Sequence, residues 1–460
     1  MNPAGGLARF RFLALAAAGA LSCAGDAPVR AQWLITLRTD APLPLVADRL
    51  LVEITRENGS LACSACRRLF DAGVDQWPLS FGVAEAQGPL YVRARLYRAR
   101  RLTLSGEPDA ETTIDARTRL PNAPSPVGIE LRANCLGVPS TLTESCAPET
   151  GELAPVRVAL AGSGDRALVP GSWNEAIVES CKGEPPEGMT CVDGGLFFFA
   201  GLEVEEGNRD ALVRISSFFL DRAEMTVGAA RTLFAKGIIE ARPVLRASGL
   251  VPASKCTYVG DTDASNDAWP LNCVDLDLAR ALCAAQGKRL PTDAELAYVA
   301  GNGAQATTYP WGEDDDVCAH AIVARGDAID PNIGISTLEC RSHGVGTLPW
   351  GPVAGGSASD LTLVAPGVRD LGGNLSEWVE DTFARVVWFK DRVARVPEPC
   401  WRGRPLLPPL VDPVCRDGEG AVIRGGSWDY DAWTAGSRFR LQVTPDATNA
   451  TGLRCAKNAR

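Results

Sequence analysis

Fifteen cysteines in a chain of 460 residues limit the fold more than any other feature of the sequence. They follow no repeated metal-ligand spacing, so we expect a chain that folds in an oxidising compartment and is crosslinked by disulfides. Most of the pairings cannot be deduced from the sequence alone. Cys181 and Cys191 flank a polar segment rich in proline and glycine, and we predict that residues 179–191 form a linker closed by a Cys181–Cys191 disulfide.

The N-terminus also predicts export. Arg9 and Arg11 precede an apolar run at 12–20, which is too short to span a bilayer and is typical of a secretory signal. Cys23 follows the run closely, as in bacterial lipoprotein signals. We therefore expect residues 1–23 to be a signal, Cys23 to carry a lipid that anchors the protein to a membrane, and the protein to reside in the periplasm or at the outer membrane. The alternative is ordinary cleavage nearby, with Cys23 discarded.

Charge and histidine content exclude several function classes. The formal net charge is −10, with no large basic field, so nucleic acid is not an expected partner. The two histidines, His320 and His343, cannot form a three-histidine metal centre. Cys63 and Cys66 form one isolated CxxC motif. Its neighbours have the composition of strands, which favours a structural disulfide over redox catalysis.

The composition of the chain changes near its middle. Residues 27–178 contain short runs of strand-forming residues separated by turn-rich pieces, which predicts a small β-sandwich-like domain. Beyond the linker, tryptophan, glycine and turn signals become dense. Helical periodicity is convincing at 223–235 and 275–286, and Thr292 with Glu295 supplies a capping box for a third, shorter helix.

The second half carries a series of motifs in a defined order. They are VDGGLFFFAG, VRISSFFLDRAEMT, CAAQGKRLPTDAELAYVA, YPWG, GVRDLGGNLSEWVED, VIRGGSW and TGLRCAK. Together they resemble the formylglycine-generating enzyme (sulfatase-modifying factor) family over residues 190–460. The resemblance implies a compact α+β domain with little regular secondary structure, distantly similar to C-type lectin domains. It also implies an oxidoreductase that converts a sulfatase cysteine to formylglycine.

One departure from the family bears directly on that activity. The family's oxidases hold copper with two cysteines shortly after GGSW, because thiolates are suitable ligands for Cu(I). By position these cysteines fall on Tyr430 and on Ala435 or Gly436, and no two cysteines of the chain lie five residues apart. Copper is therefore not expected. We interpret the protein as a non-catalytic module that binds an unidentified ligand or protein of the cell envelope. The alternative is a true formylglycine-generating oxidoreductase.

The resemblance also implies a calcium site. By position, its two side-chain oxygens and two backbone carbonyls fall on Asp370, Gly373, Leu375 and Glu377. Oxygen ligands suit a hard cation, and a Gly-Gly turn lets the backbone curl around it. The alternative is that Asp370 and Glu377 cap a local turn.

Two further expectations follow from the family. Its substrate groove predicts a ligand-binding surface, with buried core packing as the alternative. The residues concerned are Ser427, Trp428, Tyr430, Trp433, Arg438 and Arg440. The family also pairs a cysteine of the helix before GKRLPT with the cysteine of the last motif, which implies a Cys283–Cys455 disulfide. The alternative for these two residues is a pair of buried free thiols.

Overall fold

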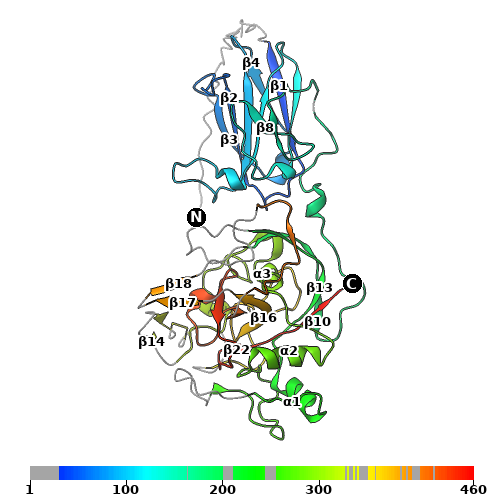
Figure 1. Cartoon of the computed structure of the whole chain (residues 1–460), viewed down its shortest axis with the longest axis vertical. Helices are drawn as coiled ribbons and strands as arrows, with labels where there is room; N and C mark the ends of the chain where they lie inside the picture. The colour runs from blue at the N-terminus through cyan, green and yellow to red at the C-terminus, as the bar shows by residue number, and fades with distance from the viewer. Residues whose placement is uncertain are drawn as a thin grey trace, which may run out of the picture.

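A computed structural model describes residues 31–460, apart from 163, 200–210, 244–254, 327–328, 331–334, 337–338, 341–350, 358, 384–385, 390–391, 396–404, 418–419 and 460. Residues 1–23 and Cys23, for which a lipoprotein signal is expected, lie outside this range. The described residues form two lobes stacked along the long axis of the molecule (Figure 1). No helix among them is long and apolar enough to cross a membrane.

The N-terminal lobe consists of two main sheets around one apolar core. The sheets have the strand orders β4-β1-β7 and β3-β2-β5-β6, and a β8-β9 hairpin lies beside them. Alternate residues of β1 (Trp33, Ile35 and Leu37) are buried in this core. The strands are β1 (Gln32–Thr39), β2 (Arg49–Thr55), β3 (Arg67–Asp71), β4 (Leu79–Ala84), β5 (Tyr91–Tyr97), β6 (Ile114–Arg119), β7 (Pro126–Leu131), β8 (Glu144–Cys146) and β9 (Leu153–Pro155).

The C-terminal lobe combines short helices with several small sheets, as expected for an α+β fold with little regular structure. Its main sheets have the orders β21-β20-β16-β22, β10-β13-β23 and β11-β12-β19. The strands are β10 (Met189–Val192), β11 (Gly195–Phe199), β12 (Ala211–Ile215), β13 (Phe218–Asp221), β14 (Ile329–Asp330), β15 (Ile335–Ser336), β16 (Ser376–Phe383), β17 (Val386–Phe389), β18 (Arg392–Arg395), β19 (Leu410–Val411), β20 (Gly420–Arg424), β21 (Arg440–Val443), β22 (Thr451–Gly452) and β23 (Ala456–Asn458).

Each helix begins next to a residue that caps its first turn. They are α1 (Val227–Ala235), α2 (Leu276–Ala284), α3 (Asp293–Ala300) and α4 (Val317–His320). The first helix starts later than the predicted residue 223, because the side chain of Thr226 accepts the N–H of Ala229 and caps the helix there. Asp275 caps α2 in the same way. The predicted capping box of α3 is confirmed, since Thr292 and Glu295 each accept the other's backbone N–H.

Strand β11 joins the cores of the two lobes. All five of its residues are buried, and successive side chains of a strand point to opposite faces. Phe197 and Phe199 pack in the C-terminal core, whereas Leu196 and Phe198 pack in the N-terminal core together with Leu212 of β12. The family-like half of the chain therefore completes the core of the N-terminal lobe.

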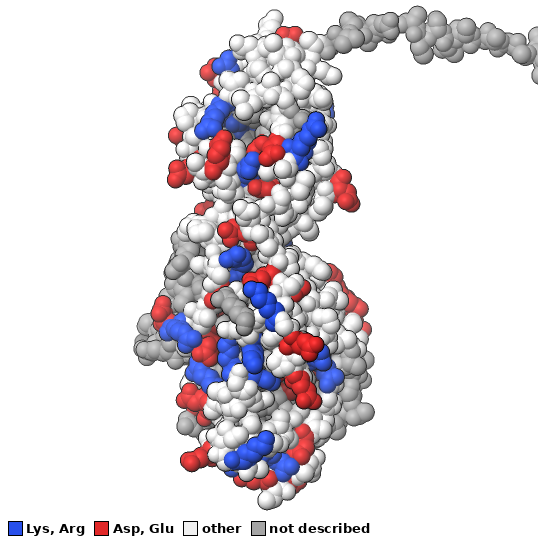
Figure 2. All heavy atoms as spheres, turned by 90° about the vertical axis from the view of Figure 1, so that its right-hand side faces the viewer, with Lys and Arg blue, Asp and Glu red and all other residues white. Residues whose placement is uncertain are grey.

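Positive and negative side chains are mixed on one face of the molecule. Figure 2 shows Lys and Arg interspersed with Asp and Glu on both lobes, with no broad field of a single sign on that face.

We expect Phe198→Ala to destabilise the whole chain by about 3–5 kcal/mol, because it leaves a cavity in a core shared by both lobes. Urea unfolding followed by tryptophan fluorescence and by circular dichroism should give one coincident transition at a lower midpoint. Leu104→Ala, at a fully exposed position, is the control and should change the free energy of unfolding by less than about 0.5 kcal/mol. Two separate transitions, only one of which moves, would contradict the shared core.

Candidate functional site: a buried carboxylate cluster

A fully buried arginine lies at the centre of the C-terminal lobe. Arg454, just before β23, donates from Nε to both carboxylate oxygens of Glu377 at 2.7 and 2.8 Å. Its Nη2 lies 2.6 Å from Oε1 of Glu377 and also donates to the backbone carbonyls of Arg369 and Asp370. Such a two-pronged contact fixes both side chains, because the guanidinium fork matches the carboxylate. Glu377 lies on β16 in the central sheet, so this ion pair connects the end of the chain to that sheet.

The neighbouring disulfide holds this arginine in place. Cys455 follows Arg454 directly and is bonded to Cys283 of α2, with the two Cα atoms 5.6 Å apart. The structure thus contains the pairing that the family resemblance implied. It also contains the Cys181–Cys191 disulfide beside β10.

Three more carboxylates are buried around this pair. Glu224 accepts the N–H of Leu375 and the side-chain amide of Asn374, at 2.8 and 2.6 Å. Asp370 accepts the N–H of Ser357. Asp360 accepts the N–H of Gly372 through Oδ2, whereas its Oδ1 is buried and has no hydrogen-bond partner among the described residues.

The four carboxyl groups share the charge of Arg454 and that of the partly exposed Arg369, whose Nε lies 3.7 Å from Oδ2 of Asp370, so negative charge is in excess. Burial and the charges of Asp370 and Glu377 raise the pKa of Glu224 well above its usual value. Burial, followed by repulsion from Asp370, raises the pKa of Asp360 to about 8, and burial raises the pKa of Asp370 to about 7. The pKa of Glu377 is also raised by burial, against the attraction of Arg454. The cluster therefore needs either protons or a further cation near neutral pH.

The structure places the four predicted calcium ligands in one turn and the strand that follows it. Asp370 has a φ of 60°, in the left-handed region, and the turn passes very close to another segment. A Cβ on Gly373 would lie 2.8 Å from the backbone nitrogen of Ile322, so only glycine fits there. Gly373 and Leu375 could contribute only backbone carbonyls, as the resemblance implied. Both oxygens of Glu377 already bind Arg454.

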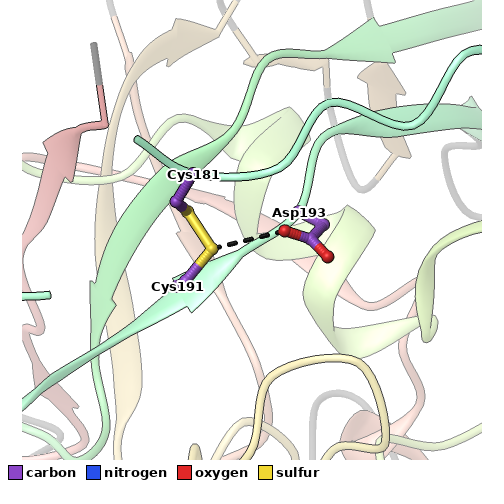
Figure 3. Close-up of side chains that lie close together, drawn as sticks. All are labelled: Cys181, Cys191 and Asp193. Carbon is purple, nitrogen blue, oxygen red and sulfur yellow. Dashed lines mark hydrogen bonds between the residues drawn. A yellow bond between two sulfur atoms is a disulfide. The ribbon is translucent and has the colours of Figure 1, made fainter. Parts of the chain in front are cut away.

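A second group of residues has atoms of the kinds that bind metal ions and lies apart from the carboxylate cluster. Cys181, Cys191 and Asp193 have ligand atoms within 4.8 Å of one another, and no other such trio of Cys, His, Asp or Glu occurs among the described residues. Figure 3 shows that the two sulfurs are bonded to each other, with Cys191 against the carboxylate of Asp193. A disulfide offers no thiolate, so this trio does not form a metal site.

The predicted ligand groove divides into core residues and surface residues. Ser427 and Trp428 are buried, and the indole N–H of Trp428 donates to the carbonyl of Asn449. Arg440 is also buried and forms an ion pair with Asp293 of α3. Tyr430 and Arg438 are half-buried, whereas Trp433 is 49% exposed and packs edge-on against Phe439. Trp433 is thus the exposed ring of the set, and Trp428 belongs to the core.

Glu224 and Asp360 were not recognised from the sequence as members of this cluster. Glu224 lies in the motif VRISSFFLDRAEMT, 153 positions before Glu377, and no periodicity relates the two. An acidic residue near the end of an apolar motif is only a weak indication of a buried carboxylate. Its role can be recognised only when the fold shows which other carboxylates lie beside it.

The fold is an α+β domain with little regular secondary structure, which is the class of domain that the motifs implied, and a cluster of buried carboxylates lies within it. A match to the FGE-sulfatase family, described as a sulfatase-modifying factor enzyme 1-like domain, covers residues 174–459. The chain belongs to this family, which confirms the resemblance drawn from its motifs.

Similar proteins include one named as a formylglycine-generating enzyme and one named as an inactive form. A formylglycine-generating enzyme of Streptomyces coelicolor is 28% identical over 181 residues, which cover 38% of this chain and 48% of that protein. The inactive C-alpha-formylglycine-generating enzyme 2 of Bos taurus is 26% identical over 201 residues, covering 42% and 51%. The chain spans about half the length of these curated relatives. Among solved structures, PvdO from Pseudomonas aeruginosa is 21% identical, with a TM-score of 0.38, covering 62% of this chain and 99% of that one.

In chelator, we expect the cluster to make the folded protein less stable as the pH rises. The raised pKa values mean that the folded state binds more protons than the unfolded state between about pH 4 and pH 8. Each such carboxyl then removes at most about 1.4 kcal/mol of stability per pH unit across that window, and nothing further above it. Asp360→Asn should flatten the decline, measured by urea unfolding at several pH values.

The control for this experiment is Asp277→Asn. Asp277 lies on α2 and its side chain is 95% exposed, so its loss should leave the pH profile as in the wild type. A profile that is equally steep in the wild type and in Asp360→Asn would show that Asp360 is ionised in the folded protein.

Proposed function

We propose that this chain is a non-catalytic member of the family that acts as a binding module. The observation that carries the proposal is the lack of a thiolate pair. Tyr430 and Ala435 or Gly436 occupy the positions where the family resemblance implies copper-binding cysteines. Each of the thirteen cysteines that the structure describes is disulfide-bonded, so none of them can supply a thiolate to Cu(I).

The surroundings of these positions also favour a structural role. The ring of Tyr430 packs edge-on against Phe439, and burial raises the pKa of its phenol to about 12. Ala435 is buried in a small apolar cluster with Val323 and Cys340. A relative named as an inactive formylglycine-generating enzyme is consistent with loss of activity within this family.

The second candidate function is the oxidation of a sulfatase cysteine to formylglycine. The similarity to the enzyme of Streptomyces coelicolor favours it. That activity would require copper ligands other than cysteines at the family positions. The absence of thiols there therefore makes the binding module the better-supported function.

The experiment that separates the two functions offers a cysteine-containing sulfatase peptide to the full chain. We expect no formylglycine by mass spectrometry, with or without added copper, while an active family oxidase converts the same peptide in parallel. Turnover by this chain would overturn the non-catalytic proposal. Unchanged peptide in both assays would show only that the positive control had failed, so the parallel conversion is required.

We further propose that the carboxylate cluster takes up a calcium ion. The donor chemistry fits in charge, because the four buried carboxylates outnumber Arg454 and the partly exposed Arg369. No three of these carboxylates bring oxygens within 4.8 Å of one another, so backbone carbonyls would complete the ligand set. Asp370 and Glu377 would contribute carboxylate oxygens, and Gly373 and Leu375 backbone carbonyls. When bound, calcium supplies positive charge that stabilises the fold.

We expect calcium to raise the melting temperature of the wild type, by an amount that grows with pH as the carboxylates ionise. At a hundredfold excess over Kd the stabilisation is about 2.7 kcal/mol. Asp370→Asn should abolish the calcium effect and leave the fold intact, since asparagine tolerates the left-handed conformation. Melting curves in calcium and in chelator provide the measurement.

Glu377→Ala is compared with Asp370→Asn in the same two buffers. It should lower the melting temperature in chelator as well, because it leaves Arg454 buried without its partner, which costs about 3–5 kcal/mol. Wild-type curves that are the same in calcium and in chelator would leave only the turn-capping alternative for Asp370.

The site of action that we propose is the cell envelope, with Trp433 among the residues that contact an envelope ligand or protein. Half-exposed aromatic rings are favourable binding contacts. We propose that a lipid on Cys23 supplies the membrane anchor.

Replacing Cys23 by serine should abolish labelling with a lipid precursor and release the protein from the membrane fraction of the expressing cells. The matched control is Ser22→Ala, which leaves the thiol in place and should keep both the label and the membrane association. Unchanged labelling of Cys23→Ser would mean that Cys23 is merely part of a discarded signal.

A further inference from the structure

A pocket lies between the two main sheets of the N-terminal lobe. Strand β3 is the outer strand of one sheet and β4 is the outer strand of the other, and both are labelled in Figure 1. Residues of both strands line the pocket, which has a volume of about 380 Å³. Pockets that hold small molecules have volumes of about 300–1,000 Å³, so this one has room for a small ligand.

The walls of this pocket are largely apolar. Val52 and Phe70 contribute to them from the first of these sheets, and Phe81 and Val83 from the second. The rings of Phe70 and Phe81 stack with their centroids 6.3 Å apart, and both residues are only half-buried. An apolar ligand in the pocket would cover part of this surface and remove it from water, which favours binding.

One arginine of the lining has no polar side-chain partner among the described residues. Arg68 lies opposite Val52 in the pairing of β2 with β3 and two positions before Phe70, so its side chain leaves the sheet on the same face as theirs. No hydrogen bond or ion pair joins its guanidinium to a residue that the structure describes. The preceding Arg67 points to the opposite face, where its Nη2 lies 2.6 Å from a carboxylate oxygen of Glu107. Arg68 is thus available to a ligand in the pocket.

We infer that this pocket binds a small carboxylate that carries an apolar chain, such as a medium-chain fatty acid. The chain would lie along the apolar walls, and its carboxylate would meet the planar fork of Arg68, which matches two carboxylate oxygens. An apolar cavity of about 150 Å³ accommodates benzene, so the larger volume here accommodates a chain of about eight carbons. The pocket lies in the N-terminal lobe, apart from the carboxylate cluster, and the inference does not depend on the proposed function.

Glu85 is the other charged residue among those that line the pocket. It follows the last residue of β4, so the alternation of the strand no longer fixes the direction of its side chain. No ion pair joins it to Arg68. Arg68, by contrast, lies within β3 beside two apolar lining residues, so a chain that covers them places its head group at the guanidinium. An anionic head group therefore fits the pocket better than a cationic one.

The experiment measures the binding of octanoate, octanol and octylammonium to the full chain by isothermal titration calorimetry, at one ionic strength and below micelle-forming concentrations. The three compounds share an apolar chain and differ in the charge of the head group. The wild type should bind one octanoate, about fivefold to tenfold more tightly than octanol, because the carboxylate gains an ion pair with an exposed guanidinium. Octylammonium should bind more weakly than octanoate.

Three variants test the assignment to Arg68. Arg68→Gln should bind octanoate about fivefold to tenfold more weakly than the wild type and should bind octanol equally well. The matched control is Arg166→Gln, which removes the same charge from an exposed position of the same lobe outside the lining and should leave octanoate binding unchanged. Glu85→Gln should bind octanoate at least as tightly as the wild type, because it removes a negative charge from the pocket.

Four results would each overturn the inference. They are the absence of octanoate binding by the wild type, equal binding of octanoate by the wild type and Arg68→Gln, octylammonium binding as tight as that of octanoate, and weaker octanoate binding by Glu85→Gln. In the first case, Arg68 would serve only as an inward-pointing charge that keeps the outer edge of β3 from pairing with another chain.

Discussion

The ion pair between Arg454 and Glu377 is the interaction on which the C-terminal lobe depends. Arg454 is completely buried, and besides Glu377 it donates to three backbone carbonyls, those of Asp221, Arg369 and Asp370. These contacts connect the end of β13, the turn before β16 and β16 itself. In a fold with little regular secondary structure, such side-chain links replace the long hydrogen-bond ladders that order larger sheets. The Cys283–Cys455 disulfide fixes the arginine's own segment to α2 and so keeps it in position.

The same region contains more negative charge than this arginine can balance. Glu224, Asp360 and Asp370 each accept backbone or amide hydrogen bonds, yet burial raises the pKa of all three. Protonation neutralises part of this surplus, and the calcium ion that we propose would neutralise it in another way, with the opposite dependence on pH. We therefore expect the stability of this domain to depend on pH and on calcium.

The junction of the two lobes depends on apolar packing and on one buried arginine, Arg98. Arg98 rests on Phe198, and Phe198 belongs to the strand whose alternate side chains divide between the two cores. Apolar packing of β11 in both cores thus connects the two lobes at this strand.

Local signals in the sequence were sufficient to predict where some helices begin. Capping residues act on the neighbouring turn, so Asp275 and Thr292 marked the starts of α2 and α3. The motifs identified the family, and with it the α+β fold and the pairing of Cys283 with Cys455. Aromatic residues near GGSW were harder to interpret, because composition does not distinguish an exposed ring such as Trp433 from a buried one such as Trp428.

By itself, the sequence determined the family, the lack of cysteines at the copper positions and the local starts of the helices, since each depends on residue identity or on neighbours within one turn. Only the tertiary structure decided which charges meet. Glu224 and Asp360 join Glu377 from distant parts of the chain, and Arg98 meets Phe198 across two lobes. Electrostatic interactions depend on distance and burial in three dimensions, and neither quantity is encoded in any local pattern of residues.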